Sequence, residues 1–257
     1  MKNLFDVSGK TVLVTGGSRG IGEMIATGFA ANGAKVYISS RDIAACDEVA
    51  KRLTDEGGTC IALPNDLGSM DGIEKLAADI KEREGQLDVL INNAGANWGA
   101  PIDEYPEAGW DKVMSLNVKS IFFLTQKLLP ELRAAGSHEN PARVINTASI
   151  DGMHAPGLET YAYSSSKAAV INLTRHLASR LARDHINVTG IAPGPFQSKM
   201  MKATIDNFGD ALVQSVPRKR IGVPADMAGV AMFLASEASS YITGTTIPVD
   251  GGLVAAS

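Results

Sequence analysis

Cysteine and histidine are scarce in this chain of 257 residues, which holds two cysteines and four histidines. Cys46 and Cys60 have no metal-ligand spacing, and the histidines do not cluster along the sequence. The sequence therefore predicts no metal site. The two thiols are expected to be buried and free rather than joined in a disulfide, as in a reducing compartment.

Long apolar runs and a large excess of one charge are also absent. No stretch reaches the roughly 18 apolar residues that would span a membrane, and the first residues lack an apolar signal segment. The net charge is −4, with lysine and arginine scattered along the chain. We therefore expect a cytoplasmic protein with neither nucleic acid nor a membrane as its partner.

What the chain does contain is a regular alternation of short β-branched runs and helix-length segments. Several of these runs are apolar almost throughout, as strands covered on both faces must be. The expected strands are 11–15, 35–39, 59–63, 87–91, 143–146, 186–191 and 245–249. The expected helices are 20–32, 42–56, 69–84, 109–135, 162–184 and 224–236, with Pro130 kinking or breaking the fourth. This order predicts a single α/β domain over residues 1–257, a doubly wound Rossmann-type fold with about seven mainly parallel strands and helices on both faces.

A glycine-rich turn follows the first expected strand and opens the first expected helix. Gly16, Gly20 and Gly22 permit a tight turn, close approach of the backbone to a pyrophosphate, and close packing of helix on strand. The phosphates would bind the free N–H groups of the helix N-terminus. A turn without a ligand is the alternative, but the position of this turn in an α/β chain favours a dinucleotide.

The end of the second expected strand distinguishes NADP from NAD. NAD sites usually place an acid there to bind the ribose 2′-hydroxyl. This chain has Arg41, whose guanidinium could pair with a 2′-phosphate, and Arg19 in the glycine-rich turn is a second cation within reach. NADP is the expected cofactor. The alternative is that Arg41 is solvated and Asp42 only caps the next helix.

Tyr163 and Lys167 lie four residues apart on an expected helix and therefore share one face. A lysine ammonium and an oxidised nicotinamide both favour the phenolate, so they would lower the pKa of the tyrosine toward neutral pH. The pattern predicts Tyr163 as the general acid that protonates a carbonyl oxygen during reduction. Tyr161 is the competing tyrosine, but the residue four positions beyond it is Ser165.

Two further polar residues stand where a catalytic role is plausible. Ser149 follows the fifth expected strand, at the edge of the sheet where parallel α/β folds bind ligands, and its hydroxyl could orient a substrate oxygen. Asn117 lies inside an apolar helical segment, where a polar amide side chain is unfavourable unless it has a structural or functional role. A strand-end serine and a satisfied core asparagine are the alternatives.

Together these motifs resemble the short-chain dehydrogenase/reductase superfamily, and the resemblance covers the whole chain. Asn117, Ser149, Tyr163 and Lys167 match its catalytic tetrad. The resemblance implies that Asn117 holds a backbone kink with a water and that Lys167 bonds the nicotinamide ribose. The residues expected at the cofactor are Gly16, Ser18, Arg19, Gly20, Ile21, Gly22, Arg41, Asp66, Leu67, Asn93, Ala94, Gly95, Tyr163, Lys167, Pro193, Gly194, Phe196 and Ser198.

One departure from the superfamily lies between Ser149 and Tyr163, which are fourteen residues apart, one more than is commonest. The loop 150–160 therefore carries an extra residue that is expected to reshape the substrate wall. His154 in this loop is interpreted as a pocket or surface residue rather than a catalytic one.

Segments such as Trp98-Gly99 and Tyr161-Ala162-Tyr163 are similar to the β-ketoacyl reductases associated with rhamnolipid synthesis. The residues around 195–215 are expected to form a substrate lid. Apolar side chains that could line a pocket there, or else pack as an ordinary helix, are Trp98, Met153, Phe196, Met200, Met201, Ile205, Phe208 and Leu212.

These features favour NADPH-dependent reduction of a 3-oxoacyl thioester carried on acyl carrier protein or CoA, as in fatty acid metabolism. A sugar acid, a polyol or another small ketone is the alternative substrate, and a non-catalytic dinucleotide sensor is a distant one. The resemblance also implies a homotetramer, with the apolar faces of 109–135 and 162–184 as candidate subunit contacts.

Overall fold

The computed structural model describes residues 3–198 and 201–256, with the backbone alone for 202–205 and 208. Its strands are β1 (Thr11–Thr15), β2 (Lys35–Ser39), β3 (Thr59–Ala62), β4 (Val89–Asn92), β5 (Ala142–Thr147), β6 (Ile186–Pro193) and β7 (Thr246–Val249). They form one sheet in the order β3-β2-β1-β4-β5-β6-β7, and every neighbouring pair is parallel. This confirms the predicted doubly wound sheet of seven strands.

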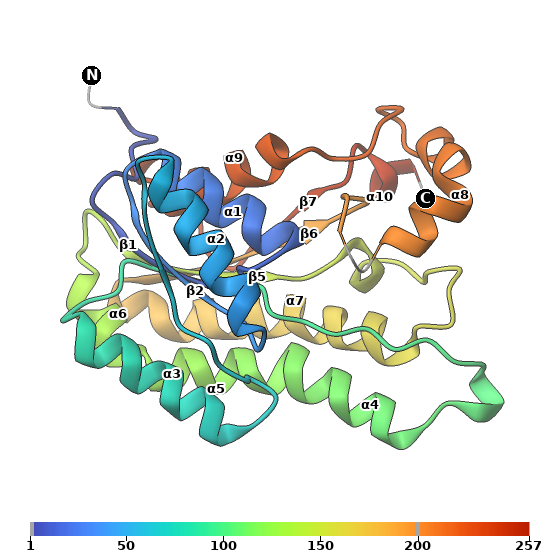
Figure 1. The fold of residues 1–257 in the computed structure, drawn as a ribbon, viewed down its shortest axis with the longest axis horizontal. Helices are drawn as coiled ribbons and strands as arrows, with labels where there is room; N and C mark the ends of the chain where they lie inside the picture. Colours follow the sequence, from blue (N-terminus) through green and yellow to red (C-terminus); the bar gives the residue numbers. More distant parts are fainter. Residues whose placement is uncertain (1–2, 199–200, 257) are drawn as a thin grey trace.

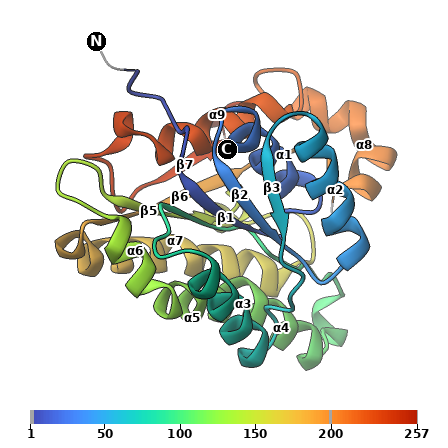
Figure 2. The ribbon, with the colours of Figure 1, turned by 60° about the vertical axis from the view of Figure 1, so that its left-hand side comes forward.

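Helices cover both faces of the sheet. They are α1 (Gly20–Ala31), α2 (Ile43–Asp55), α3 (Met70–Arg83), α4 (Glu107–Met114), α5 (Ser120–Lys127), α6 (Leu129–Ala135), α7 (Tyr161–Leu181), α8 (Lys202–Ser215), α9 (Pro224–Ala235) and α10 (Leu253–Ala256). Short turns of 3₁₀ or π-helix are η1 (Ile102–Glu104), η2 (Ser115–Lys119), η3 (Ile150–Gly152), η4 (Ala182–Asp184) and η5 (Glu237–Ser239). Helices α1, α2 and α9 lie on one face, and α3, α5 and α7 lie on the other (Figures 1 and 2).

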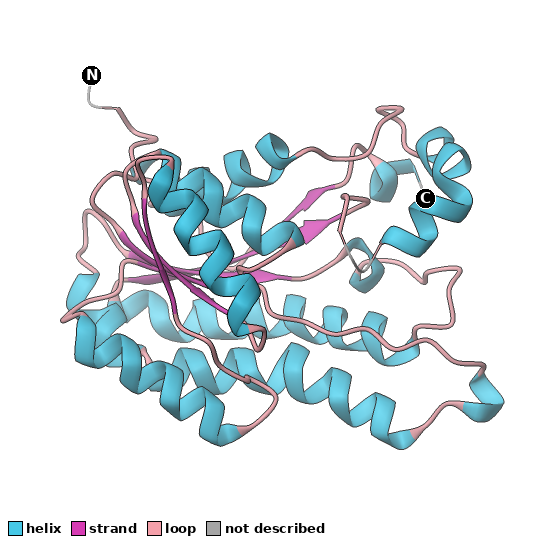
Figure 3. Ribbon diagram, viewed as in Figure 1, coloured by secondary structure: helices cyan, strands magenta, loops and turns pink. Residues whose placement is uncertain are grey.

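The sheet lies between two layers of helices (Figure 3), and it divides the apolar core into two layers. Val12 and Val14 of β1 belong to the layer under α1 and α9, whereas Leu13 belongs to the layer under α3 and α5. Successive residues of a strand point to opposite faces, so a strand with helices on both sides must be apolar throughout. All five residues of β1 are accordingly buried.

The predicted single helix 109–135 is wrong in detail, because the structure divides it into three. The π-helical turn η2 separates α4 from α5, and Leu128 interrupts the chain before α6. Pro130 lies in the first turn of α6, where its missing N–H removes no helical hydrogen bond. The predicted break at Pro130 is therefore confirmed, while the π turn was not anticipated.

The segment predicted as a lid contains α8, which lies beside the carboxyl ends of β6 and β7 rather than on a face of the sheet (Figure 1). Met200 and the side chains of Ile205 and Phe208 lie outside the described residues.

Cys46 and Cys60 are buried and free, as predicted. In the part of the chain that the structure describes, no group of three or more histidine, cysteine or acidic side chains is arranged to hold a metal ion. None of the described helices combines the length and apolar character that a membrane span requires.

Candidate active site and cofactor site

The predicted site residues follow four strands that end at one edge of the sheet. The glycine-rich loop follows β1, Asn93 to Gly95 follow β4, Ser149 follows β5, and Gly194 follows β6. Parallel pairing of β1 with β4, of β4 with β5 and of β5 with β6 brings these four segments side by side. Residues more than 100 positions apart in sequence thus form one site.

The glycine-rich loop has the backbone that the sequence required. Gly16 and Gly20 adopt φ angles of +67° and +55°, in the left-handed region that favours glycine. A Cβ at Gly22 would lie 2.2 Å from the carbonyl oxygen of Gly16, so only glycine fits there. The N-cap residue Arg19 makes no side-chain hydrogen bond to the helix, which leaves the first N–H groups of α1 available to an anion.

Thr15 holds this loop against the turn after β4, a role that sequence reasoning missed. Its Oγ1 accepts hydrogen bonds from the backbone N–H of Asn93 at 2.9 Å and of Ala94 at 3.0 Å, and donates to Ile91 O at 3.3 Å. The side-chain amide of Asn93 donates in return to Thr15 O at 3.0 Å and to Gly16 O at 3.3 Å. Asn93 therefore shapes the cofactor loop, and its amide nitrogen is already engaged.

The charged end of the cofactor site lies between the glycine-rich loop and the end of β2. Ser18 Oγ donates to Ser40 Oγ at 2.9 Å, and Arg19 Nη2 lies 3.0 Å from a carboxylate oxygen of Asp42. Arg41 is exposed and has no ion pair with any described residue. Two guanidinium groups and two hydroxyl groups here fit a phosphate.

Asp42 also caps α2, because its carboxylate accepts a hydrogen bond from Ala45 N at 3.2 Å. The alternative interpretation of Asp42 as a cap is thus correct, and it does not exclude a phosphate beside Arg41. Ser39 Oγ at the end of β2 is buried and has no partner among the described residues.

The other residues expected at the cofactor follow β3 and β6. The Asp66 carboxylate accepts from Gly68 N at 2.9 Å, and the neighbouring Leu67 side chain is buried in the core, so its backbone alone could face a ligand. Gly194 N donates to Val249 O at 3.0 Å. Ser198 lies against the glycine-rich loop, because a Cβ added at Gly20 would lie 3.2 Å from the Cβ of Ser198.

Phe196 differs from the expectation that its side chain lines a substrate pocket. The ring is 2% exposed and packs in the core layer of α1 and α9. A Cβ at Gly222 would lie 2.3 Å from this ring, so the aromatic side chain fills the space between two loops. Packing, which was the alternative to lining a substrate pocket, therefore describes the Phe196 ring.

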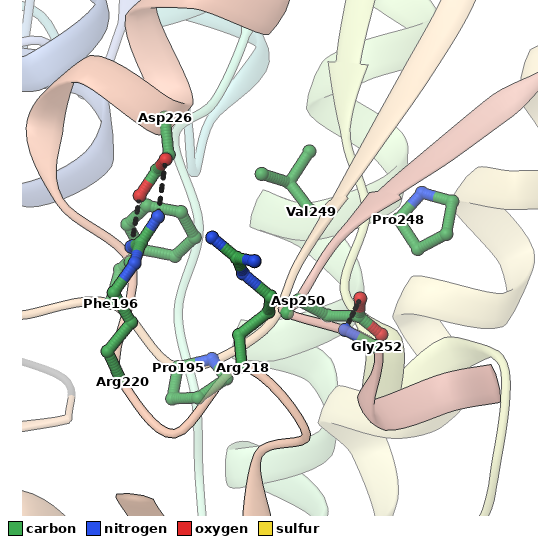
Figure 4. A pocket seen from close by; sticks show the side chains of 11 residues that line it. Pro195, Phe196, Arg218, Arg220, Asp226, Pro248, Val249, Asp250 and Gly252 are labelled. Atoms are coloured by element: carbon green, nitrogen blue, oxygen red, sulfur yellow. Dashed lines mark hydrogen bonds and ion pairs between the residues drawn. The ribbon is translucent and has the colours of Figure 1, made fainter. Parts of the chain in front are cut away.

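Two hollows flank the region around Phe196. One, of about 690 Å³, lies beside Gly20 and Met24 of the α1 N-terminus and Ser198. The other, of about 450 Å³, is drawn in Figure 4, where Arg220 holds Asp226 through two hydrogen bonds. Neither hollow is lined by a residue of the predicted tetrad, and both include residues expected at the cofactor: Gly20 and Ser198 in the first, and Phe196 in the second.

Lys167 and Tyr163 of α7 lie next to each other at the end of β5. The Lys167 side chain is 4% exposed, and its Nζ donates a hydrogen bond to Thr147 O at 2.7 Å. The same nitrogen lies 5.5 Å from the centre of the Tyr163 ring. Gly95 approaches from β4, since a Cβ there would be 3.8 Å from Nζ.

Asn117 is fully buried in the π-helical turn η2, and its amide is saturated. Its Nδ2 donates to Ala96 O and to Ser166 Oγ, both at 2.9 Å, and its Oδ1 accepts from Ala96 N at 2.8 Å. The amide thereby joins the turn after β4 to α7. The π turn supplies the irregular backbone that the resemblance implied, and such turns often mark functional sites.

Ser149 and Tyr163 share a hydrogen bond that lowers the pKa of the tyrosine, but burial is the larger effect and raises that pKa to about 12. Burial also lowers the pKa of Lys167 to about 8. The sequence led us to expect a lowered pKa for Tyr163. The structure gives the opposite direction because the phenol is desolvated by the fold, whereas part of the expected stabilisation of the phenolate was to come from a nicotinamide charge.

Tyr161 points to a different environment. Its hydroxyl donates to Glu159 Oε1 at 3.4 Å, and its ring packs edge-on against Tyr105 with centres 5.7 Å apart. The structure therefore brings Tyr163, and not Tyr161, to Lys167.

The chain is similar to known oxidoreductases over nearly its full length. Residues 16–254 match the family described as "Enoyl-(Acyl carrier protein) reductase". The rhamnolipids biosynthesis 3-oxoacyl-[acyl-carrier-protein] reductase of Pseudomonas aeruginosa is 49% identical over 98% of this chain and 99% of that protein. The 5-keto-D-gluconate 5-reductase of Escherichia coli K12 is 35% identical over the whole of both chains.

Solved structures agree with these similarities. The Pseudomonas aeruginosa RhlG/NADP active-site complex matches with a TM-score of 0.94 at 48% identity, over 99% of this chain and 100% of that one. A gluconate 5-dehydrogenase from Burkholderia cenocepacia, in complex with NADP and tartrate, matches with a TM-score of 0.92 at 32% identity, over 99% of each chain.

Proposed function

This chain belongs to the short-chain dehydrogenase/reductase family, and we propose that it reduces a 3-oxoacyl thioester to the 3-hydroxyacyl thioester with NADPH. It is an NADP-dependent oxidoreductase that acts on C=O or CH–OH groups, as its relatives solved with NADP are. The observation that carries the substrate assignment is the 49% identity to a 3-oxoacyl reductase, against 35% to a ketogluconate reductase.

The candidate site fits the nicotinamide cofactor on grounds of its own. The free N–H groups of α1, the left-handed Gly20 and the exposed Arg41 provide for the pyrophosphate and the 2′-phosphate. When bound, NADPH supplies the hydride that the carbonyl carbon accepts.

Tyr163 then acts as the proton donor. With a pKa raised to about 12 by burial, its hydroxyl keeps its proton at neutral pH and can pass it to the carbonyl oxygen as the carbon is reduced. Ser149 would orient that oxygen: its Oγ accepts a hydrogen bond from Asp151 N at 3.2 Å, and its hydroxyl, which bonds Tyr163, can donate to a substrate oxygen placed between the two. Lys167 remains largely charged below pH 8, so its ammonium can bind the nicotinamide ribose and stay beside the phenol of Tyr163.

A direct assay follows the loss of NADPH absorbance with acetoacetyl-CoA, a longer 3-oxoacyl thioester and 5-keto-D-gluconate. We expect the thioesters to give the higher kcat/KM, and NADH to support turnover poorly. A preference for 5-keto-D-gluconate would replace the substrate assignment, and no turnover on any carbonyl would favour a dinucleotide sensor.

The second candidate, reduction of a sugar acid such as a ketogluconate, is favoured by the more distant relatives of that activity. The polyhydroxylated substrate would need several hydrogen-bonding groups around it. The assay above separates the two, because a thioester lacks these hydroxyl groups.

Four expectations extend this proposal. The segment 195–215, with α8, would close over the substrate, and the exposed faces of α4, α5 and α7 would form contacts in a homotetramer. Carriage of the substrate on acyl carrier protein, and a cytoplasmic location, belong to the same proposal. Sedimentation showing only a monomer would refute the oligomer.

A further inference from the structure

The charged end of the cofactor site contains an acidic residue, Asp42, that is not among the residues expected at the cofactor. Arg19 Nη2 lies 3.0 Å from Asp42 Oδ2, and the two side chains are 46% and 49% exposed. Arg19 is the N-cap residue of α1, and Asp42 is that of α2. The ion pair therefore bridges the glycine-rich loop and the turn after β2, where the 2′-phosphate of NADP is expected to bind.

A second bridge joins the same two segments. Ser18 Oγ donates a hydrogen bond to Ser40 Oγ at 2.9 Å. Ser40 Oγ in turn bonds the backbone of Asp42, because it donates to the carbonyl oxygen at 3.2 Å and accepts from the N–H at 3.3 Å. The backbone of Asp42 is thus held against the loop that carries Arg19.

The carboxylate of Asp42 is held in place, whereas the guanidinium of Arg19 can move. Asp42 Oδ1 accepts a hydrogen bond from Ala45 N at 3.2 Å and so caps α2. Arg19 makes no side-chain hydrogen bond to its own helix. An arginine side chain has many rotamers, so Arg19 can turn from the carboxylate to a phosphate without a change in the backbone.

We propose that Asp42 is a specificity-determining residue that competes with the 2′-phosphate for Arg19 and thereby limits the affinity for NADPH and NADP⁺. This rests on the proposed function, in which NADPH is the cofactor. The phosphate carries a charge of about −1.5 to −2, and it must draw Arg19 away from an acid that the α2 cap keeps beside it. NADH has no 2′-phosphate, so its binding is not subject to this competition.

Two neighbouring residues therefore act on the phosphate in opposite directions. Arg41 has no ion pair with any described residue and is available to attract the phosphate. Asp42 withholds the second cation of the site. The limited affinity favours release of NADP⁺ after the reaction, a step that sets kcat in many enzymes.

The test replaces the carboxylate with an amide of the same shape, Asp42→Asn. Binding of NADPH and of NADH is measured by the fluorescence of the bound nicotinamide, which needs no carbonyl substrate. We expect Kd for NADPH to fall about three- to fivefold at low salt, because exposed ion pairs contribute little, and Kd for NADH to stay unchanged. The gain should shrink at high salt, which screens exposed charges.

A double-mutant cycle with Arg19 tests the competition itself. In the Arg19→Ala background, Asp42→Asn should change Kd for NADPH by less than about twofold, since the carboxylate then has no cation to withhold. The matched control is Asp55→Asn, which removes an exposed carboxylate at the opposite end of α2, where it pairs with Lys51. This control should leave both Kd values unchanged.

Folding does not limit the experiment, because asparagine caps helices about as well as aspartate. Thermal unfolding of Asp42→Asn should match that of the parent protein. An unchanged or higher Kd for NADPH in Asp42→Asn, or the same gain in the Arg19→Ala background, would overturn the proposal. If NADPH binds but no carbonyl compound is reduced, the proposed function fails, while the titrations still decide the role of Asp42.

Discussion

The two ends of the proposed site are built in opposite ways. At the chemical end, Asn117 and Lys167 are buried, and each is bonded to backbone carbonyls of other segments. At the phosphate end, Arg19, Arg41 and Asp42 are exposed, with a single ion pair between the first and the last. The residues proposed to support proton transfer are thus held by buried hydrogen bonds, whereas the residues proposed to bind the cofactor phosphate are solvated.

Buried polar side chains join the strands and the helix that carry the residues of the chemical end. Asn92 Nδ2 donates to Asn146 Oδ1 at 2.9 Å, and Asn146 Nδ2 donates to Thr174 Oγ1 at 3.0 Å. These bonds connect β4, β5 and α7, the elements next to the predicted tetrad. Such satisfied buried networks favour one arrangement of the elements they join.

The largest expected effect comes from removing the acid itself. Tyr163→Phe keeps the ring in place but deletes the hydroxyl, so kcat for reduction should fall by about 10²–10⁴-fold. NADPH binding, followed by its fluorescence, should change little because the phosphate end is untouched. Tyr161→Phe is the matched control. Retained turnover in the folded Tyr163→Phe variant would contradict the mechanism.

Breaking the network at Asn117 should affect both folding and turnover. Asn117→Ala removes the partners of the Ala96 N–H and C=O and one of the two hydrogen bonds of the Ser166 hydroxyl, which should lower the free energy of unfolding by about 2–4 kcal/mol. Urea unfolding measures this loss. A variant as stable as the parent would show that the buried end is less rigid than its bonds indicate.

At the phosphate end the effect should be confined to one cofactor. Arg41→Ala should raise KM for NADPH by roughly tenfold and leave KM for NADH nearly unchanged, since only NADPH carries the 2′-phosphate. Because Arg41 is solvated, the increase should shrink at high salt. Arg83→Ala removes an exposed cation at the end of α3 and serves as the control. Equal effects on both cofactors would place the phosphate elsewhere.

The smallest expected effect is the change in the rate of reduction with pH. The folded protein lowers the pKa of Lys167 from 10.5 to about 8, so this lysine loses its charge within the working range. Reduction should therefore decline as pH rises through 8 and fall to about half near that value. A profile of kcat that stays level up to pH 10 would show that the lysine charge is not required.

Predictions from sequence succeeded where the signal is local or periodic. The apolar run of β1, the glycines that follow it and the four-residue spacing of Tyr163 and Lys167 are properties of adjacent residues. Steric demands and helical geometry act over these short distances, so neighbouring residues alone carry the information. The same holds for Pro130, whose missing N–H requires a break wherever the helix is placed.

Sequence reasoning failed where two distant segments meet. The residues near Thr15 in the chain do not indicate that its hydroxyl binds the turn after β4. Likewise, the residues near Phe196 do not indicate that Gly222 leaves room for its ring. For the same reason, nothing in the sequence indicated the burial that raises the pKa of Tyr163. A charge four residues away can be read from the sequence, but the desolvation that outweighs it comes from the whole fold.

By itself, the sequence determined the order of strands and helices, the glycine-rich turn after the first strand and the shared helix face of Tyr163 and Lys167, because spacing and backbone freedom are set by neighbours in the chain. Only the tertiary structure decided how far Tyr163 and Lys167 are desolvated and which carbonyls hold Asn117 and Lys167. Burial and electrostatic coupling depend on distances through space, which arise only when the sheet brings the ends of its strands together.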